Sequence, residues 1–435
     1  MFPNLSWKLN HDKMLTIKLL REDPDFVAER LAIRNLDAAP IIRQILDLDV
    51  RRRAAQTEAD ALTAEQKKTA SRIGVLMAEG KHDQVSEVKK SAGESKEKVR
   101  ALIAEQEKLD KELNNLLVTL PNIPNKLVAR GEGAKDNVLV REGGQKPSLP
   151  EEALPHWDLA KKYDLIDFDL GVKLTGAGFP VYKGKGARLQ MGLIQFFLDQ
   201  NALAGYTEIM PPILVNEDSG YGTGQLPDKG EQMYHAGLDN YYLIPTAEVP
   251  LTNIYRDTIL DAVSLPVKLT AYTPCFRREA GSYGKDVRGL NRLHQFDKVE
   301  IVQLTHPSHS YSTLDQMVQH VEHLVQLLGL PYRILRLCGA DLSFTSAMTY
   351  DFEVYSAAQQ RWLEVSSVSN FETFQSNRLK ARFRAEDGKT QLVHTLNGSA
   401  LALPRIVAAL LENNQTQDGI MIPDVLHKYL HFSMI

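Results

Sequence analysis

Residues 41–120 contain no proline and carry mostly apolar or small side chains at alternating spacings of four and three residues. This repeat is typical of helices that pair as a coiled coil, because one seam of each helix then faces its partner. The first run comprises Ile41, Ile45, Leu48, Arg52, Ala55, Ala59, Leu62, Gln66, Thr69, Ile73 and Leu76, and the second Val85, Val88, Ala92, Ser95, Val99, Leu102, Gln106, Leu109, Leu113, Leu116 and Leu120. We predict two helices, at about residues 41–78 and 84–120, that reverse near Gly80 and pack as an antiparallel hairpin.

At ~1.5 Å per residue each helix would be about 55 Å long, so the hairpin is expected to project from any body that carries it. A heptad repeat by itself most often serves dimerisation or spacing. Its clusters of basic side chains, such as residues 51–53 and 89–90, are usually solvated, although they also suit contact with phosphates. The repeat alone therefore leaves the partner of the hairpin open.

The segment ahead of the hairpin predicts a short α/β lead-in. Residues 15–20 alternate enough to predict a strand, and Asp23 and Pro24 then open a short helix that runs to Ile33. Met14 stands directly before this pattern. Residues 1–13 are therefore interpreted as an extension outside the folded core.

The chain changes character after the hairpin. Pro121 and Pro124 end the second helix, and a connector rich in glycine, proline and charge follows to Pro155. Beyond it we predict helices at residues 194–203, 313–328 and 406–412, and strands at 267–272, 298–303, 350–354 and 362–365. Strands grouped between helices, without regular βαβ spacing, indicate an antiparallel α+β domain over residues 156–435. No phosphate-binding loop of the Walker or Rossmann type is present.

Composition excludes several classes of protein. No apolar run approaches the ~20 residues of a membrane helix, and the first residues lack the apolar core of a signal peptide. The two cysteines, Cys275 and Cys338, cannot build a disulfide framework and suit a reducing cytoplasm. The net charge of −4 argues against indiscriminate nucleic-acid binding but leaves recognition through a local patch open.

Residues 275–300 carry the strongest chemical signal. Arg277 and Glu279 precede a glycine-rich basic loop, and Phe296 and Glu300 follow it. If the two flanking segments pair as strands in an even register, these side chains share one surface. Arginine suits a phosphate, an aromatic face suits a purine, and a carboxylate suits an ammonium or a hydroxyl. Taken alone, the segment also fits a surface hairpin with cross-strand ion pairs.

Five blocks in order make the chain similar to a known family. Residues 203–212 resemble motif 1 of the class II aminoacyl-tRNA synthetases, residues 276–279 with 294–296 resemble motif 2, and residues 396–399 with Arg405 resemble motif 3. Within that class, the chain resembles the bacterial seryl-tRNA synthetases in residues 246–248, 279–282, 294–300 and 364–367 and in the N-terminal hairpin. The implied fold is a coiled-coil arm on an antiparallel-sheet catalytic domain flanked by helices. The implied domains are a tRNA-binding domain at 14–121, a connector at 122–155 and a catalytic domain at 156–435.

The resemblance implies a role for each motif residue. Arg277, at the α-phosphate and the serine carboxylate, and Arg405, at the γ-phosphate, are the expected catalytic residues. The expected ATP-binding residues are Arg277, Arg278, Glu279, Phe296, Glu364, Val365, Ser366, Ser367 and Arg405. The expected serine-binding residues are Thr246, Ala247, Glu248, Glu300 and Ser399. Glu364 and Ser367 would hold Mg²⁺ with the phosphates, because a hard cation prefers carboxylate and hydroxyl oxygens.

The implied activity is formation of seryl-adenylate from serine and ATP, followed by transfer of serine to tRNA(Ser) and, where it exists, tRNA(Sec). The implied assembly is a cytoplasmic homodimer formed through motif 1, with tRNA bound across the subunits. Two alternatives stay open: a relative that loads a carrier protein, and a non-catalytic RNA-binding protein of the same fold.

The chain departs from the bacterial pattern near motif 3, where Ala400 and Pro404 replace the usual glycines. Pro404 is tolerable if it lies in the first turn of a helix. Ala400 is expected to narrow the space near Ser399.

Overall fold

The computed structural model describes residues 16–228, 230–280 and 288–435. It divides into two compact units, one built mainly from residues 122–435 and the other from residues 15–32 and 36–121. The proposed extension at residues 1–13 and the tip of the motif 2 loop, with Gly281 and Ser282, lie outside the described residues.

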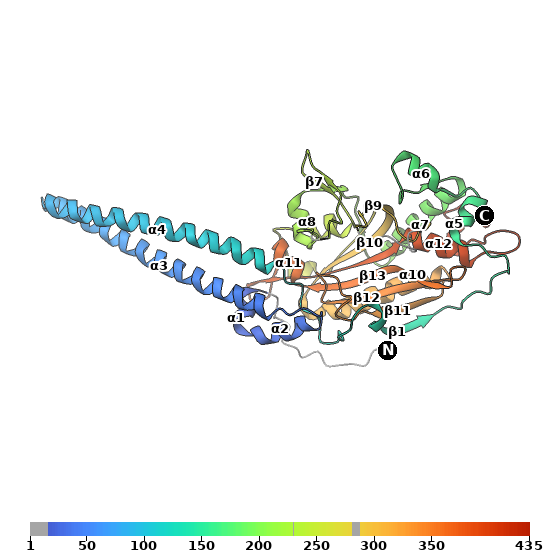
Figure 1. Cartoon of the computed structure of the whole chain (residues 1–435), viewed down its shortest axis with the longest axis horizontal. Helices are drawn as coiled ribbons and strands as arrows, with labels where there is room; N and C mark the ends of the chain where they lie inside the picture. Colours follow the sequence, from blue (N-terminus) through green and yellow to red (C-terminus); the bar gives the residue numbers. More distant parts are fainter. Residues whose placement is uncertain (1–15, 229, 281–287) are drawn as a thin grey trace. The chain divides into compact units, whose positions relative to one another are not determined.

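The smaller unit is all-helical (Figure 1), with α1 at Ile17–Glu22, α2 at Pro24–Ala32, α3 at Ala39–Ala78 and α4 at His82–Leu117. The predicted short helix and the long antiparallel hairpin are both present. The predicted strand at residues 15–20 is wrong. Thr16 caps a helix there, accepting a hydrogen bond from the backbone of Leu19, and the adjacent Leu19 and Leu20 are both buried. A strand would have sent these two neighbours to opposite faces.

The hairpin follows the predicted heptad seam. The buried seam positions are Ile45, Leu48, Ala55, Ala59, Leu76, Val85, Leu109 and Leu113. Polar contacts run antiparallel along it: Arg52 to Asp110 at 3.5 Å, Lys98 to Glu58 at 2.7 Å and Gln66 to Ser95 at 3.2 Å. The reversal falls at Gly80, whose φ of +73° favours glycine.

The larger unit is built on an eight-stranded sheet in the order β1-β11-β12-β13-β16-β10-β9-β4. Its strands are β1 Val138–Gly143, β4 Thr207–Glu208, β9 Val267–Phe276, β10 Gln295–Thr305, β11 Tyr332–Arg336, β12 Met348–Ser356, β13 Arg361–Glu372 and β16 His394–Ala402. All neighbours are antiparallel except β4 and β9, which are parallel. This arrangement confirms the predicted α+β class (Figure 1).

Helices α7 Gly184–Leu203, α10 Ser310–Leu327 and α12 Leu403–Asn413 pack on the sheet in the main hydrophobic core. On β10 the side chains of Val299 and Ile301 enter this core, whereas those of Lys298 and Glu300, which alternate with them, face the other side of the sheet. Pro404 lies in the first turn of α12, as expected. Ala400 is fully buried within the main core, so its methyl group packs among apolar side chains.

Shorter elements surround the sheet. The remaining helices are α5 His156–Lys162, α6 Phe168–Leu174, α8 Glu217–Thr223, α9 Glu248–Asn253 and α11 Phe374–Leu379. The remaining strands are β2 Ile166–Asp167, β3 Val181–Tyr182, β5 Leu214–Val215, β6 His235–Ala236, β7 Tyr241–Leu243, β8 Ile259–Asp261, β14 Arg382–Arg384 and β15 Thr390–Leu392. Within the described part of the chain, no helix is both long and apolar enough to cross a membrane.

Candidate active site

Several predicted site residues, among them Glu300 and Ser399, meet on the face of the sheet opposite the main hydrophobic core, whereas Val365 packs into that core. Glu300 on β10 lies directly opposite Ser399 on β16, and Ser399 Oγ is 3.5 Å from Glu300 Oε2. Phe296 lies opposite Cys275 at the end of β9, beside Arg277. The even register expected between these two segments is therefore present, and three motifs far apart in sequence share one surface.

A buried polar cluster occupies the middle of this surface. The side chains of Thr246, Glu248 and Glu300 are buried there together with that of Lys298. Nζ of Lys298 donates to Thr246 Oγ1 at 2.8 Å and to Glu300 Oε2 at 2.6 Å. Ala247 is also buried, but its methyl group packs in a neighbouring apolar cluster. Contact between Ala247 and a ligand would therefore use its backbone.

Glu248 begins α9 and has a perturbed acidity. Burial, and then the negative charge of Glu300, raise the pKa of Glu248 to about 7. A hydrogen bond from Gln375 at 2.5 Å and the charges of Lys298 and Arg277 oppose this rise in pKa. Thr395 in turn donates to the Gln375 oxygen at 2.7 Å, which directs the amide nitrogen toward Glu248. The cluster thus holds two buried carboxylates, one of which, Glu300, is paired with the ammonium of Lys298.

Motif 2 supplies a stacked cation and ring. The guanidinium of Arg277 lies 5.2 Å from the centre of the Phe296 ring, and the Arg277 backbone donates to the carbonyl of His294 at 2.9 Å. Arg278 is exposed, and its backbone donates to Gln232 at 2.8 Å. The carboxylate of Glu279 forms an ion pair with Arg292, so it is already fixed before any ligand binds.

Motif 3 supplies a second arginine, which contacts β13 and the segment that follows the motif 2 loop. Arg405 donates from Nη1 to the backbone oxygen of Glu364 at 2.7 Å and from Nε to that of Asn291 at 3.1 Å. Its Nη1 also lies 3.8 Å from the Glu364 carboxylate. The guanidinium is thus held between β13 and the segment that leads from the motif 2 loop into β10.

A bulge on β13 arranges the remaining predicted residues. Ser366 pairs with Phe352 and Glu364 pairs with Glu353, which leaves Val365 as an extra residue. As a result, Glu364 and Ser367, three positions apart, face the same side, and their oxygens lie 3.4 Å from each other. Val365 packs in the core, and the Ser366 hydroxyl donates to the Ser399 carbonyl at 2.6 Å. These two residues can reach a nucleotide only through their backbone.

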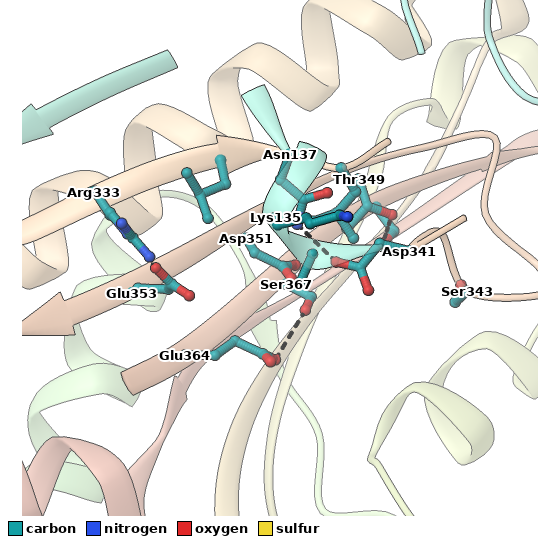
Figure 2. A pocket seen from close by; sticks show the side chains of 14 residues that line it. Lys135, Asn137, Arg333, Asp341, Ser343, Thr349, Asp351, Glu353, Glu364 and Ser367 are labelled. Atoms are coloured by element: carbon teal, nitrogen blue, oxygen red, sulfur yellow. Dashed lines mark hydrogen bonds and ion pairs between the residues drawn. The ribbon is translucent and has the colours of Figure 1, made fainter. Parts of the chain in front are cut away.

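A polar cavity of about 610 Å³ continues from Glu364 and Ser367 across β12 and β11 (Figure 2). Its polar lining comprises Lys135, Asn137, Arg333, Asp341, Ser343, Thr349, Asp351, Glu353, Glu364, Ser367 and Ser369. Burial and the charge of Glu364 raise the pKa of Asp351 well above its ordinary value. The cavity therefore adds an acidic wall to the end of the site where Glu364 lies.

The donor set for a cation is small and consists of oxygens. Residues 16–228, 230–280 and 288–435 contain no group of three or more His, Cys, Asp or Glu side chains arranged to hold a metal ion. The Glu364 carboxylate and the Ser367 hydroxyl are oxygen donors of the kind that Mg²⁺ prefers. They fit a cation that takes its other ligands from water and phosphate.

Two members of the cluster were missed from the sequence. Lys298 is two residues from both Phe296 and Glu300 on β10 and therefore faces the same side of the sheet, so the period-two pattern of the strand could have indicated it. Gln375 lies on α11, outside every motif, and no sequence signal points to it.

Two family models and a curated relative match this chain over most of its length. A family model described as the seryl-tRNA synthetase N-terminal domain matches residues 14–124, and one described as the tRNA synthetase class II core domain (G, H, P, S and T) matches residues 233–414. A serine–tRNA ligase of Salinibacter ruber is 48% identical over 424 residues, which are 97% of this chain and 99% of that protein. This chain belongs to the seryl-tRNA synthetase family.

Solved members of the seryl-tRNA synthetase family have the same fold. The enzyme from Pyrococcus horikoshii, crystallised with ATP, superposes with a TM-score of 0.91 at 34% identity, covering 97% of this chain and 99% of its own. The cytoplasmic enzyme from Naegleria fowleri, in complex with AMP, gives 0.86 at 25% identity, covering 97% and 98%. The relationship therefore extends over both units of the chain.

Proposed function

We propose that this chain attaches serine to the 3′ end of tRNA in two steps, through a seryl-adenylate. The observation that carries the proposal is the buried cluster of Lys298, Glu300 and Ser399 beside the stacked pair of Arg277 and Phe296. The polar groups of the cluster can form hydrogen bonds with the hydroxyl and the ammonium of serine, and the stacked pair can bind the base and the phosphates of ATP.

Serine recognition is assigned to the buried cluster. Glu300 uses Oε2 for Lys298 and Ser399, which leaves Oε1 for the hydroxyl or the ammonium of serine. Glu248 supplies a second carboxylate for the ammonium, and Thr246, Ala247 and Ser399 complete the wall. A pocket whose buried polar groups form hydrogen bonds with a substrate hydroxyl would favour serine over alanine by about 10⁴ in kcat/KM, because alanine would leave those groups unpaired.

ATP binding is assigned to motifs 2 and 3. Phe296 would stack on the adenine and Glu279 would bind its edge, with Arg278 at the rim. Arg277 would bridge the α-phosphate and the serine carboxylate, and Arg405 would bind the γ-phosphate. Glu364 and Ser367, with the backbone of Val365 and Ser366, would line the phosphate end.

Adenylation then needs no nucleophile from the protein. The serine carboxylate attacks the α-phosphorus, a new carboxylate–phosphorus bond forms, and the bond from the α-phosphorus to the bridging oxygen breaks to release pyrophosphate. Arg277 stabilises the charge that grows on the α-phosphate, and Arg405 orients the leaving group. Mg²⁺ held by Glu364 and Ser367 would supply positive charge to the phosphates.

We further propose that the unit at residues 14–121 binds the long variable arm of tRNA(Ser), and of tRNA(Sec) where it exists, in the cytoplasm. Recognition by a helical hairpin would depend on RNA shape and backbone contacts, which suits a chain with a net charge of −4. A homodimer through motif 1 is supported by exposed apolar side chains along α7 and the segment after it, namely Met191, Leu203, Met210 and Leu214.

The test is ATP–pyrophosphate exchange without tRNA, with serine, threonine, alanine and glycine compared. We expect exchange with serine and loss of that exchange in Arg277→Ala. A folded wild-type protein that gives no exchange would contradict the activation step. Exchange without charging of tRNA would instead indicate another acceptor, such as a carrier protein.

A further inference from the structure

Two buried residues outside the site residues described above form a tight pair. His156, the first residue of α5, and Glu412, near the end of α12, have no solvent exposure, and His156 Nδ1 lies 2.7 Å from Glu412 Oε1. Glu412 also accepts from the backbone of His156 at 2.9 Å, from Gln359 at 2.8 Å and from Ser356. Glu412 therefore has a full set of donors.

The hydrogen bonds define the state of the imidazole. Nε2 of His156 accepts from the backbone N–H of Leu290 at 2.8 Å. A nitrogen that accepts carries no proton, so the proton lies on Nδ1 and is directed at Glu412. Burial alone would raise the pKa of Glu412, but the hydrogen bonds from His156 and Ser356 outweigh it and hold that pKa below its ordinary value. His156 thus connects Glu412 of α12 to the backbone N–H of Leu290.

Leu290 lies in the segment that returns from the motif 2 loop, and the next two residues contact the candidate active site. The Asn291 carbonyl accepts from Arg405 Nε, and Arg292 pairs with Glu279. Helix α12 therefore holds this segment at two points, directly through Arg405 and, about two turns further on, through Glu412 and His156.

Gly289 shows how closely the imidazole approaches this segment. It has a φ of +66°, and a Cβ atom at this position would lie 2.2 Å from His156 Nε2. A side chain there could fit only if the backbone moved away from the ring. The chain therefore has a glycine where the histidine requires one.

We propose that His156 is a positioning residue for ATP. By fixing Leu290, it keeps the Asn291 carbonyl in place to orient Arg405 and keeps Arg292 in place to hold Glu279. The inference rests on the proposed function, because the ligand of Arg405 and Glu279 is taken to be ATP. The serine cluster shares no hydrogen bond with this network among the described residues, so serine binding should be insensitive to it.

The decisive experiment compares two substitutions at position 156. In His156→Asn, the amide nitrogen can replace Nδ1 and still reach Glu412, but nothing accepts from Leu290. In His156→Gln, the longer amide can place its oxygen near the position of Nε2 and accept from Leu290. We expect His156→Asn to raise KM for ATP by about 10- to 100-fold in serine-dependent exchange, because small displacements of positioning groups have effects of this size. We expect His156→Gln to return KM for ATP to within a few-fold of wild type, with KM for serine within twofold in both.

A purely structural role gives a different result. Equal effects of the two variants, or parallel changes in KM for serine and for ATP, would overturn the proposal, as would a folded His156→Asn protein with the wild-type KM for ATP. If His156→Asn does not fold, Gly289→Ala displaces Leu290 while leaving His156 and Glu412 intact, and it should raise KM for ATP alone. The wild-type protein serves as the reference: absence of exchange there contradicts the proposed function itself.

Discussion

The ammonium of Lys298 lies 2.6 Å from Oε2 of Glu300, and both side chains are almost fully buried. Beside them the pocket holds a second carboxylate, Glu248, whose pKa the charges of Lys298 and Arg277 lower against the effect of burial. The ammonium of a bound amino acid would add a further positive charge beside the two carboxylates. Lys298 therefore prepares Glu300 for serine by fixing one of its oxygens.

Removing Lys298 should weaken serine binding more than ATP binding. In Lys298→Met, Glu300 is left buried without its partner, which costs roughly 3–5 kcal/mol in comparable buried pairs. We expect a lower free energy of unfolding in urea, and a KM for serine raised at least 10-fold with a smaller change in KM for ATP.

The control for this prediction is the double variant Lys298→Met/Glu300→Gln, which removes the unpaired charge. It should regain most of the stability but not the binding of serine. Wild-type KM for serine in the single variant would show that the ion pair is not part of the amino-acid site.

Serine binding should depend on pH near neutrality through Glu248, whose pKa is raised to about 7. A substrate ammonium favours the ionised carboxylate, so KM for serine should fall as the pH rises from 6 to 8. Glu248→Gln should give a flat profile over this range, measured by exchange at saturating ATP. An unchanged slope in that variant would assign the titration to another group.

The same shift in pKa has the opposite effect on the free protein. Because the folded-state pKa of Glu248 is above the unfolded value, its contribution to stability is complete below about pH 4.5 and is lost as the pH rises through about 7. The loss amounts to about 3 kcal/mol, since one pKa unit corresponds to about 1.4 kcal/mol. The free energy of unfolding of Glu248→Gln, relative to wild type, should therefore increase between pH 5 and pH 8.

The local part of this site follows from sequence, and the long-range part does not. Alternation along β10 was enough to place Phe296 and Glu300 on one face, and the heptad repeat was enough to predict α3 and α4. The bulge at Val365 is set by the pairing of β13 with β12, which no local pattern encodes. The contact of His156 with Glu412 joins residues 256 positions apart, so it appears only when the chain is folded.

The strand that was wrongly predicted at residues 15–20 also shows that a local pattern cannot specify structure that depends on tertiary contacts. Six residues of partial alternation fit either a strand or a helix, and the choice depended on a cap at Thr16 and on packing against α3. Tertiary contacts of this kind override weak local preference.

Glu364 should control the response to Mg²⁺. Its carboxylate is half-exposed, and it lies on the same face as the Ser367 hydroxyl because of the β13 bulge. In Glu364→Gln we expect the Mg²⁺ concentration for half-maximal exchange to rise at least 10-fold, with partial recovery of the rate in excess Mg²⁺. A matched control is Glu353→Gln in the same cavity, because Glu353 is already paired with Arg333. Equal sensitivity of both variants would mean that the acidic wall acts only through its overall charge.

A substitution in the helical unit should impair the charging of tRNA without affecting amino-acid activation. Asp49 of α3 is completely buried and accepts from three arginines, Arg21 and Arg53 at 3.0 Å and Arg52 at 3.1 Å. Asp49→Ala removes the common partner of these arginines and should destabilise the packing of α1 on α3 by about 2 kcal/mol, less than a fully buried pair because the arginines are partly solvated. Serine-dependent exchange should be unchanged, since it uses only groups of the larger unit, whereas charging of tRNA(Ser) should fall. Asp47→Asn, an exposed change on the same helix, should affect neither reaction. Equal losses of exchange and of charging in Asp49→Ala would contradict the assignment of this unit to tRNA binding.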